Sequence, residues 1–472
     1  MSGRLAGTLG PRTRQVVYGH ADPEAIRAEL ALTTEVDLAH LVMLAENGLI
    51  TAAAARDLVR YVTELRATGF AALHGVEQPR GLYLAYERHL SDVLGPDTGG
   101  RLHTGRSRND LKATATAMRA RSTALDLARE TGRLLAVLLN RARAHRAVVM
   151  PVYTHFQAAM PVTYGYHLVG VAHALGRDLA ALRDACAGLA RCPLGAGAVS
   201  GTDLPIDPGR TAELLGFDGP PVHAVDAVAS RDALLRVLAA ASGIALTISR
   251  LAADLQVWSS AEFGFVTFPD RLVGGSSAMP QKRNAFLLEH LKAKAAIAVG
   301  AWTAAASATR AAPFTNSIEV GTEAVSAVWP GLTAVADAVA IAQVCVSGAR
   351  PVPDRMVERA ERGFVTATAV ANRMVRDGTP FRAAHTAVGA AVRAAVDQGS
   401  TELTGLDVPV PGLDEVVAAH TAGGGPGAFA ESFAEAHRQV EALCRWQWKW
   451  QAGLNAARAR LAEAAGRLGG AP

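Results

Sequence analysis

The middle of this chain carries apolar residues at steps of three and four over unusually long stretches. One such stripe consists of Leu168, Val171, Leu175, Leu179 and Leu182. A second consists of Val237, Ile244, Ile248, Leu251, Leu255 and Trp258. This spacing places each set on one face of an α-helix. Because the helices are long and are separated by short breaks containing Gly or Pro, the sequence predicts an elongated helix bundle.

The same periodicity predicts further helices on both sides of these two. In the centre we expect helices over residues 113–149, 287–306 and 322–346, and before them shorter ones over 22–32, 35–46 and 51–68. After Arg350 the pattern becomes shorter, and Gly and Pro cluster between residues 405 and 427. No segment alternates apolar and polar residues for long, so we expect little sheet beyond a short hairpin. Ala and Leu dominate and favour an all-α fold.

The composition argues against several classes of protein. The net charge is only +4 and no Lys/Arg block is interleaved with aromatic residues, which argues against a nucleic-acid partner. The cysteines have no spacing suited to zinc, so reduced thiols are expected, with a Cys186–Cys192 pair as the less favoured reading. The first twenty residues lack a leader pattern, and Asp337 interrupts the apolar run after Pro330. We therefore expect a cytoplasmic protein with no membrane span.

The sharpest local feature is the run GGSSAMPQKRNAFLLEH from Gly274 to His290. Tandem glycines allow the backbone to move and to approach a ligand closely. Hydroxyl, ammonium and amide groups beside such a hinge would suit a lid that closes on an anionic substrate. A Gly/Ser loop considered alone is more often a linker. We find no P-loop and no GxGxxG after a strand, so no cofactor or metal is expected.

Several long motifs identify this chain as similar to a known superfamily. Gly275 to Asn284 match the signature loop GSSxMPxKxN of the fumarase/aspartase superfamily without a gap. The HTGRSRND segment, His103–Asp110, and YTHFQAAMPVTYGYH, Tyr153–His167, resemble argininosuccinate lyases. Further likeness lies in Pro193–Thr202, Asp226–Asp232 and Gly378–Gly389. The resemblance runs from about residue 35 to residue 400.

This resemblance implies a cofactor-independent elimination that releases fumarate. Such a reaction removes a proton beside a carboxylate and passes through a doubly negative aci-carboxylate, which needs preorganised donors and a cation. By resemblance, Ser276 takes the proton, activated by backbone amides and Lys282. Lys282 and Asn284 hold the carboxylate on which charge accumulates. Ser107, Arg108 and Asn109 bind the succinyl end, where an Arg fork suits a carboxylate.

The remaining site residues are also assigned by resemblance. His155, oriented by Glu289, donates a proton to the leaving nitrogen. The other substrate-binding candidates are Thr154, Gln157 and Asn316. Each assignment has a plainer rival. A histidine is often structural, and Glu289 could pair with Lys292 along one helix.

The departures from argininosuccinate lyase are concentrated on the amine side of the site. Asn316, Gly321 and Ala324 replace the Tyr, Gln and Lys of the stretch that helps to hold the arginine half. Gly81 and Tyr83 replace an acidic residue and a His. Other departures are Met160 and Ala285.

These departures predict a lyase for another N-succinyl compound, one whose amine is not arginine. The alternatives are an ordinary argininosuccinate lyase and a non-catalytic paralogue. Retention of Ser276, Lys282, His155 and Glu289 together argues against the latter.

The superfamily further implies three helical domains and a homotetramer. We place the N-terminal domain at residues 1–103, the central long-helix bundle at 104–350 and the small C-terminal domain at 351–472. The active sites would be shared between subunits, because each draws motifs from three chains. The extensive apolar stripes suit such an assembly. Trp446, Trp448 and Trp450 alternate near the C-terminus and are expected on a helix that spreads their rings over packing contacts.

Overall fold

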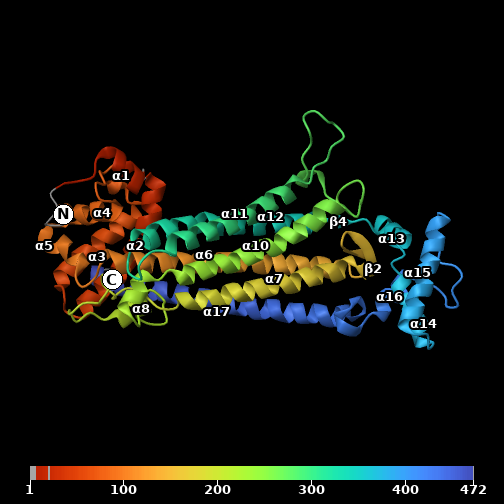
Figure 1. Ribbon diagram of the computed structural model, residues 1–472. Helices are drawn as coiled ribbons and strands as arrows, with labels where there is room; N and C mark the ends of the chain where they lie inside the picture. Colours follow the sequence, from red (N-terminus) through yellow and green to blue (C-terminus); the bar gives the residue numbers. More distant parts are fainter. Residues whose placement is uncertain (1–6, 20–21, 471–472) are drawn as a thin grey trace.

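The computed structural model describes residues 7–19 and 22–470. Residues 1–6 and 20–21, part of the segment in which no leader was expected, and residues 471–472 lie outside the described ones. The molecule is a long helical bundle with a cluster of N-terminal helices at one end and small helices at the other (Figure 1). The predicted all-α, long-helix architecture is confirmed.

The bundle is built from five long helices that lie side by side. They are α6 (Arg108–Ala144), α7 (Tyr164–Cys186), α10 (Asp232–Trp258), α11 (Phe286–Thr309) and α12 (Val325–Gly348). The largest core follows their inner faces, and residues of the Leu168 and Val237 stripes are buried in it. Because a helix rises about 1.5 Å per residue, the 37 residues of α6 span roughly 55 Å. The two ends of the bundle are therefore far apart.

The N-terminal helices pack across one end of the bundle. They are α1 (Pro11–Tyr18), α2 (Pro23–Glu46), α3 (Ala52–Ala67), α4 (Leu82–Leu94) and α5 (Pro96–Gly99). The prediction of two separate helices over 22–32 and 35–46 is wrong, because α2 is continuous. Thr33 and Thr34, which look like a break, donate their hydroxyls to the carbonyls of Glu29 and Leu30 one turn earlier. Both hydroxyl groups therefore have hydrogen-bond partners within the helix, and the helix continues through them.

The expected hairpin lies at the opposite end of the bundle. Strand β1 (Val149–Thr154) pairs antiparallel with β2 (Gln157–Thr163). A second, two-residue pair joins β3 (Val266–Thr267) to β4 (Arg350–Pro351). The ring of Tyr153 lies 5.5 Å from that of Phe263 and 6.2 Å from that of Phe265. The hairpin and the chain that follows α10 therefore share one end of the bundle.

Short helices connect and extend the bundle. They are α8 (Pro208–Leu214), α9 (Ala224–Ala229), α13 (Pro353–Arg362), α14 (Ala367–Arg376), α15 (Phe381–Asp397) and α16 (Leu413–Ala419). A small second core forms around Val370, Ala371, Ala384 and Val388. The proposed domain boundaries near residues 103 and 350 stay a prediction.

The last helix departs from the expected short C-terminal pattern. Helix α17 (Phe429–Gly469) has 41 residues and runs back along α6 and α7 (Figure 1). Its fully buried positions are mostly alanines, which give a weak apolar stripe in the sequence. Trp446 and Trp450 pack against the main core, whereas Trp448 is 72% exposed. The expected helix is therefore present, but only two of the three tryptophan rings make the expected packing contacts.

Two segments, α10 and residues Glu319–Gly348, are long and apolar enough to cross a membrane by length and composition alone. Half of each apolar window is buried inside the bundle. Core helices of soluble proteins pass the same test, so this is weak support for a membrane span. Asp337, which interrupts the second segment, forms an ion pair of 2.6 Å with Lys294 of α11.

Candidate active site

The loop that carries the superfamily signature projects from the hairpin end of the bundle, just before α11 (Figure 1). Its base is closed by a reciprocal backbone pair, in which the amides of Gly274 and Asn284 each donate to the other's carbonyl at 2.8 Å. Arg283 adds an ion pair with Asp270 and a bond of 3.0 Å to the carbonyl of Phe268. The base is therefore fixed to the bundle, while residues 275–281 extend beyond it.

Within this loop the Ser276 hydroxyl has a defined electrostatic setting. Its Oγ accepts hydrogen bonds from the backbone amides of Ala278 at 3.3 Å and Met279 at 3.1 Å. Backbone donors of this kind stabilise negative charge on the oxygen that they meet. The expected backbone amides are thus present at Ser276. Lys282 is exposed in the same loop, and Asn284 donates its side-chain amide to the carbonyl of Gly275 at 3.3 Å.

His155 stands at the tip of the hairpin, in a turn that is strained. Thr154 pairs with Gln157, leaving His155 and Phe156 as the two-residue loop. Their φ angles are +52° and +58°, a left-handed conformation that side chains rarely adopt. Two-residue hairpins favour positive φ at both central positions, usually with Asn and Gly. Strain of this kind is found at functional sites, and here it holds His155 exposed at the bundle end.

Glu289 lies in the first turn of α11 and is exposed. Its Oε1 accepts a hydrogen bond of 3.1 Å from the side chain of Gln256 in α10. No hydrogen bond joins Glu289 to His155 or Lys292 within the described part of one chain. The proposed pairing of Glu289 with His155 therefore needs either a movement of the loop end or a second copy of the chain.

The Ser107–Asn109 segment begins α6, at the other end of the bundle. Ser107 is the N-cap, and its Oγ accepts from the amide of Asn109. Asp110, fully buried behind it, accepts four backbone amides: Ser107 and Leu111 at one oxygen, and Gly195 and Gly197 at the other. Burial raises the pKa of Asp110, and these backbone donors act in the opposite direction. Arg108 is left exposed at the start of the helix.

A buried ion pair anchors the same segment to the N-terminal helices. Arg106 lies 2.7 Å from Asp37 of α2, and both side chains are 0% exposed. Tyr86 donates to the other oxygen of Asp37 at 2.9 Å. His40 contacts the carbonyl of Thr104 at 2.8 Å. Breaking a buried pair of this kind costs roughly 3–5 kcal/mol, so the backbone leading to Ser107 is held firmly.

The structure of one chain separates the candidate residues into two groups. At the hairpin end lie Thr154, His155, Gln157, Ser276, Lys282, Asn284 and Glu289, and at the other end lie Ser107, Arg108, Asn109 and Asn316. Asn316 follows α11 and precedes the π-helix η5 (Glu319–Ala324). The length of α6 makes contact between the groups impossible within one chain.

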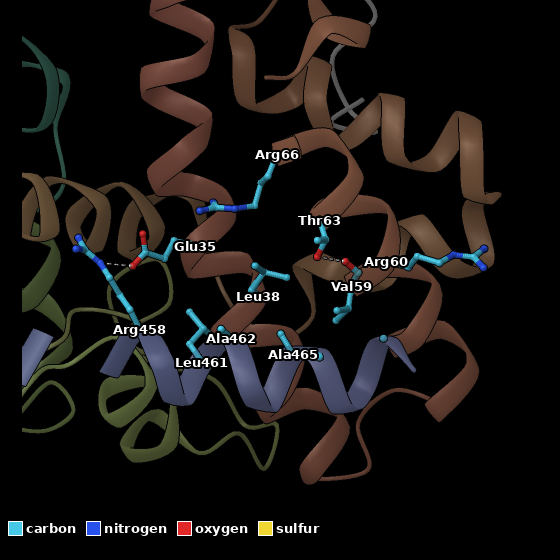
Figure 2. A pocket seen from close by; sticks show the side chains of 12 residues that line it. Glu35, Leu38, Val59, Arg60, Thr63, Arg66, Arg458, Leu461, Ala462 and Ala465 are labelled. Carbon is cyan, nitrogen blue, oxygen red and sulfur yellow. Dashed lines mark hydrogen bonds and ion pairs between the residues drawn. The ribbon is translucent and has the colours of Figure 1, made fainter. Parts of the chain in front are cut away.

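The large cavities of one chain lie elsewhere. Figure 2 shows one of about 570 Å³ between the N-terminal helices and the end of α17, where Arg458 lies 3.6 Å from Glu35. Another, of about 820 Å³, lies beside α7, α8 and α17. No candidate site residue lines either cavity. This is expected if the site closes only between copies, because each chain then contributes an open surface.

Sequence reasoning missed several residues that shape the site. Asp110 could have been found, because Ser followed three residues later by an acidic residue is a helix-start pattern. Asp37 carries no such signal, since its partner Arg106 is distant in sequence. Gln256 likewise meets Glu289 only because α10 packs against α11.

Comparison with known proteins agrees with this geometry. Residues 29–300 match the family described as lyase, and residues 364–411 match the argininosuccinate lyase C-terminal family. The argininosuccinate lyase of Methanoculleus marisnigri is 38% identical over 407 residues, which are 86% of this chain and 81% of that protein. That of Methanospirillum hungatei is 33% identical over an alignment of 476 positions that covers 96% of each chain.

Solved structures give the same relationship. EDDS lyase in complex with formate superposes with a TM-score of 0.87 and 26% identity, over 98% of this chain and 97% of the other. A variant of EDDS lyase with bound fumarate superposes with a TM-score of 0.86 and 25% identity, over the same shares of the two chains. Class II fumarase from Schistosoma mansoni, at 16% identity and a TM-score of 0.69 over 92% and 95%, shares the fold.

The fold and the signature loop together define an all-α lyase of the fumarase/aspartase superfamily. Within that superfamily, the chain belongs to the argininosuccinate lyase-like enzymes. It is a carbon–nitrogen lyase that releases fumarate, and members of its family act on small dicarboxylate substrates.

Proposed function

We propose that this lyase reversibly eliminates an amine other than arginine from an N-succinyl compound. The observation that carries the proposal is the burial and hydrogen bonding of Tyr83, which replaces a residue on the amine side of the site in argininosuccinate lyases. Its side chain is only 6% exposed, and its hydroxyl is occupied by Arg106 at 3.0 Å and Glu87 at 3.0 Å. Asn316, Gly321 and Ala324 lie in or beside a π-helix, a feature that often marks functional sites.

The fumarate side supports ordinary superfamily chemistry. Ser276 takes the proton from the carbon beside the carboxylate, and its two amide donors favour the charged oxygen. Lys282 and Asn284 hold the carboxylate on which charge develops. The carbon–nitrogen bond then breaks, its electron pair leaves with nitrogen, and His155 supplies a proton to that nitrogen. The products are fumarate and the free amine.

One alternative has a specific observation in its favour. The relatives that are 33% and 38% identical are argininosuccinate lyases, which supports arginine as the amine. Against this, the residues that contact the arginine half in argininosuccinate lyases are replaced in this chain. Each polar group of argininosuccinate left buried without a partner would weaken its binding by roughly 1–3 kcal/mol. The non-catalytic reading has no comparable support.

We further propose that the active unit is a cytoplasmic homotetramer whose sites combine both ends of the bundle. One chain leaves large apolar side chains exposed on three bundle helices, namely Leu246, Ile297, Val299, Trp302 and Val344. Large apolar side chains exposed on several bundle helices would be covered if further copies pack against those helices. In the tetramer, Ser107–Asn109 of one copy would meet His155 and Ser276 of others.

Mass spectrometry tests the proposed reaction. Purified protein is incubated with fumarate and a broad pool of amines, and in parallel with argininosuccinate. Ser276→Ala is the blank, and Ser277→Ala, one position along the same exposed loop, is the matched control. We expect a new fumarate–amine adduct with the parent protein and Ser277→Ala, and none with Ser276→Ala.

The other outcomes are equally informative. Serine-dependent fumarate from argininosuccinate as the best substrate would replace the proposal with the ordinary biosynthetic enzyme. The absence of any Ser276-dependent product from either mixture would leave the protein without the proposed activity.

A further inference from the structure

One ionisable side chain beside the succinyl-binding segment has no role in the chemistry described above. His103 ends the 3-10 helix η2 (Gly100–His103), four residues before Ser107, and its side chain is 38% exposed. Its Nδ1 lies 3.0 Å from Oε1 of Glu87 and 3.1 Å from the hydroxyl of Tyr83. Glu87 and Tyr83 are one turn apart on α4.

The contacts around Nδ1 determine which ring nitrogen carries the hydrogen. Arg106 donates to the Tyr83 hydroxyl at 3.0 Å, and that hydroxyl donates to Glu87 at 3.0 Å. Because the Tyr83 hydroxyl has already donated its hydrogen to Glu87, its oxygen can only accept a further hydrogen bond. The ionised carboxylate of Glu87 can also only accept. Both neighbours of Nδ1 therefore require a donor, and Nδ1 carries the hydrogen. When the imidazole is uncharged, Nε2 is then left as a hydrogen-bond acceptor.

The backbone keeps this imidazole in a defined place. The amide of Arg106 donates to the carbonyl of His103 at 3.4 Å, which makes a tight turn between His103 and Ser107. The buried Arg106–Asp37 pair and the His40 contact to Thr104 fix both sides of that turn. Nε2 has no hydrogen-bond partner among the described residues. An oriented acceptor thus lies beside the segment that holds the succinyl end.

We propose that His103 is a substrate-contacting residue whose Nε2 accepts a hydrogen bond from an N–H group of the amine half. The inference rests on the proposed function. Nε2 is an acceptor close to the negative charge of Glu87, so it would not bind a carboxylate of the substrate. The substrate carboxylates have Arg108 and Lys282 as partners instead. It favours an ammonium or amide N–H. The preferred amine would therefore carry a second N–H donor in addition to the reacting nitrogen.

Steady-state kinetics in the direction of amine addition separate this role from a structural one. With the amine identified by mass spectrometry, KM for the amine and KM for fumarate are measured for the parent and for His103→Ala. Loss of a hydrogen bond to a charged donor raises the amine KM roughly ten- to a hundredfold. The fumarate KM stays within about twofold, because fumarate makes no contact with Nε2. His103→Gln, which keeps an acceptor oxygen, recovers part of the amine affinity.

Two further variants serve as controls on position. Glu87→Gln and Tyr83→Phe each weaken one contact that orients Nδ1 of His103. Each is expected to raise the amine KM by less than His103→Ala does. His89→Ala changes a histidine on the same helix that contacts Tyr61 instead, and both KM values stay unchanged. Light scattering checks that each variant keeps the assembly of the parent.

Equal increases in both KM values, or an unchanged amine KM in His103→Ala, would overturn the assignment of His103 while leaving the lyase activity in place. Loss of any Ser276-dependent product in the parent would remove the proposed function and the assignment with it.

Discussion

Single residues in this enzyme hold conformations that cost energy locally. His155 and Phe156 both have left-handed backbone at the hairpin tip, at a cost of roughly 1–2 kcal/mol each. Phe156 is 82% exposed in one chain and gains little from burial there. The turn is kept by the strand pairing on either side of it. Its consequence is that the proposed proton donor stands clear of the bundle, where another chain can reach it.

Asp110 gives a residue-scale test of how the succinyl segment is held. The carboxylate oxygens of Asp110 accept hydrogen bonds from four backbone amides. In Asp110→Asn, an NH2 group replaces one of these oxygens and cannot accept from the amides that face it. Leaving buried donors unpaired costs roughly 2–4 kcal/mol. We expect a loss of that size in urea denaturation. Asp126→Asn on the same helix, where the carboxylate is 57% exposed, changes stability by less than about 0.5 kcal/mol. Equal effects of the two changes would contradict the account.

The carboxylate of Glu87 makes stability depend on pH in acid. Burial raises its pKa, but hydrogen bonds from His103 and Tyr83 and the charges of His103 and Arg106 together lower it by more, so the pKa lies below the ordinary value. The ionised group therefore stabilises the fold above about pH 4.3, the ordinary glutamate pKa, and this contribution is lost as the pH falls below that. We expect Glu87→Gln to lower the urea midpoint at pH 7, with the gap narrowing towards pH 3.5. Glu402→Gln, changing an exposed carboxylate, gives no gap at either pH.

At the scale of elements, the packing of α6 against α7 depends on one close approach. A Cβ at Gly165 would collide with the carbonyl oxygen of Ala142 and lie 2.8 Å from the Cα of Arg146. At Gly170, on the same helix, a Cβ would meet nothing within 4 Å. The two positions therefore form a matched pair.

We expect Gly165→Ala to destabilise the protein by about 1–3 kcal/mol, since backbone must move. Gly170→Ala should stabilise it by roughly 0.5–1 kcal/mol through helix propensity. Thermal unfolding of both variants is the measurement. A stable Gly165→Ala protein would mean that the helices are not packed as closely as the structure has them.

Element boundaries could be predicted only where local signals agreed with packing. The stripes through Leu168 and Ile248 predicted α7 and α10, because their side chains are long and apolar. Helix α17 was missed for the opposite reason, since its buried side is largely alanine and its burial comes from contact with α6 and α7. The break expected after residue 32 failed because two threonines bonded back to their own helix.

At the scale of the whole molecule, the proposed site can form only if copies combine, because one chain separates its two groups of residues. We expect Arg108→Ala and Ser276→Ala proteins to be inactive alone and to recover activity when their subunits are exchanged by reversible dissociation. Some sites in the mixed assembly would then contain neither change. Each variant exchanged with itself is the control. If native mass spectrometry found mixed assemblies that stayed inactive, the shared site would be disproved.

The sequence by itself determined the all-α bundle and the superfamily, because helical periodicity and an uninterrupted signature loop are local properties of the chain. It also indicated Ser276 and Ser107–Asn109 as site residues. Only the tertiary structure decided that these groups stand at opposite ends of α6, since their distance depends on helix length and packing. It alone showed the Asp37–Arg106 pair and the orientation of His103, because ion pairs form between residues that are distant in sequence and share no local pattern.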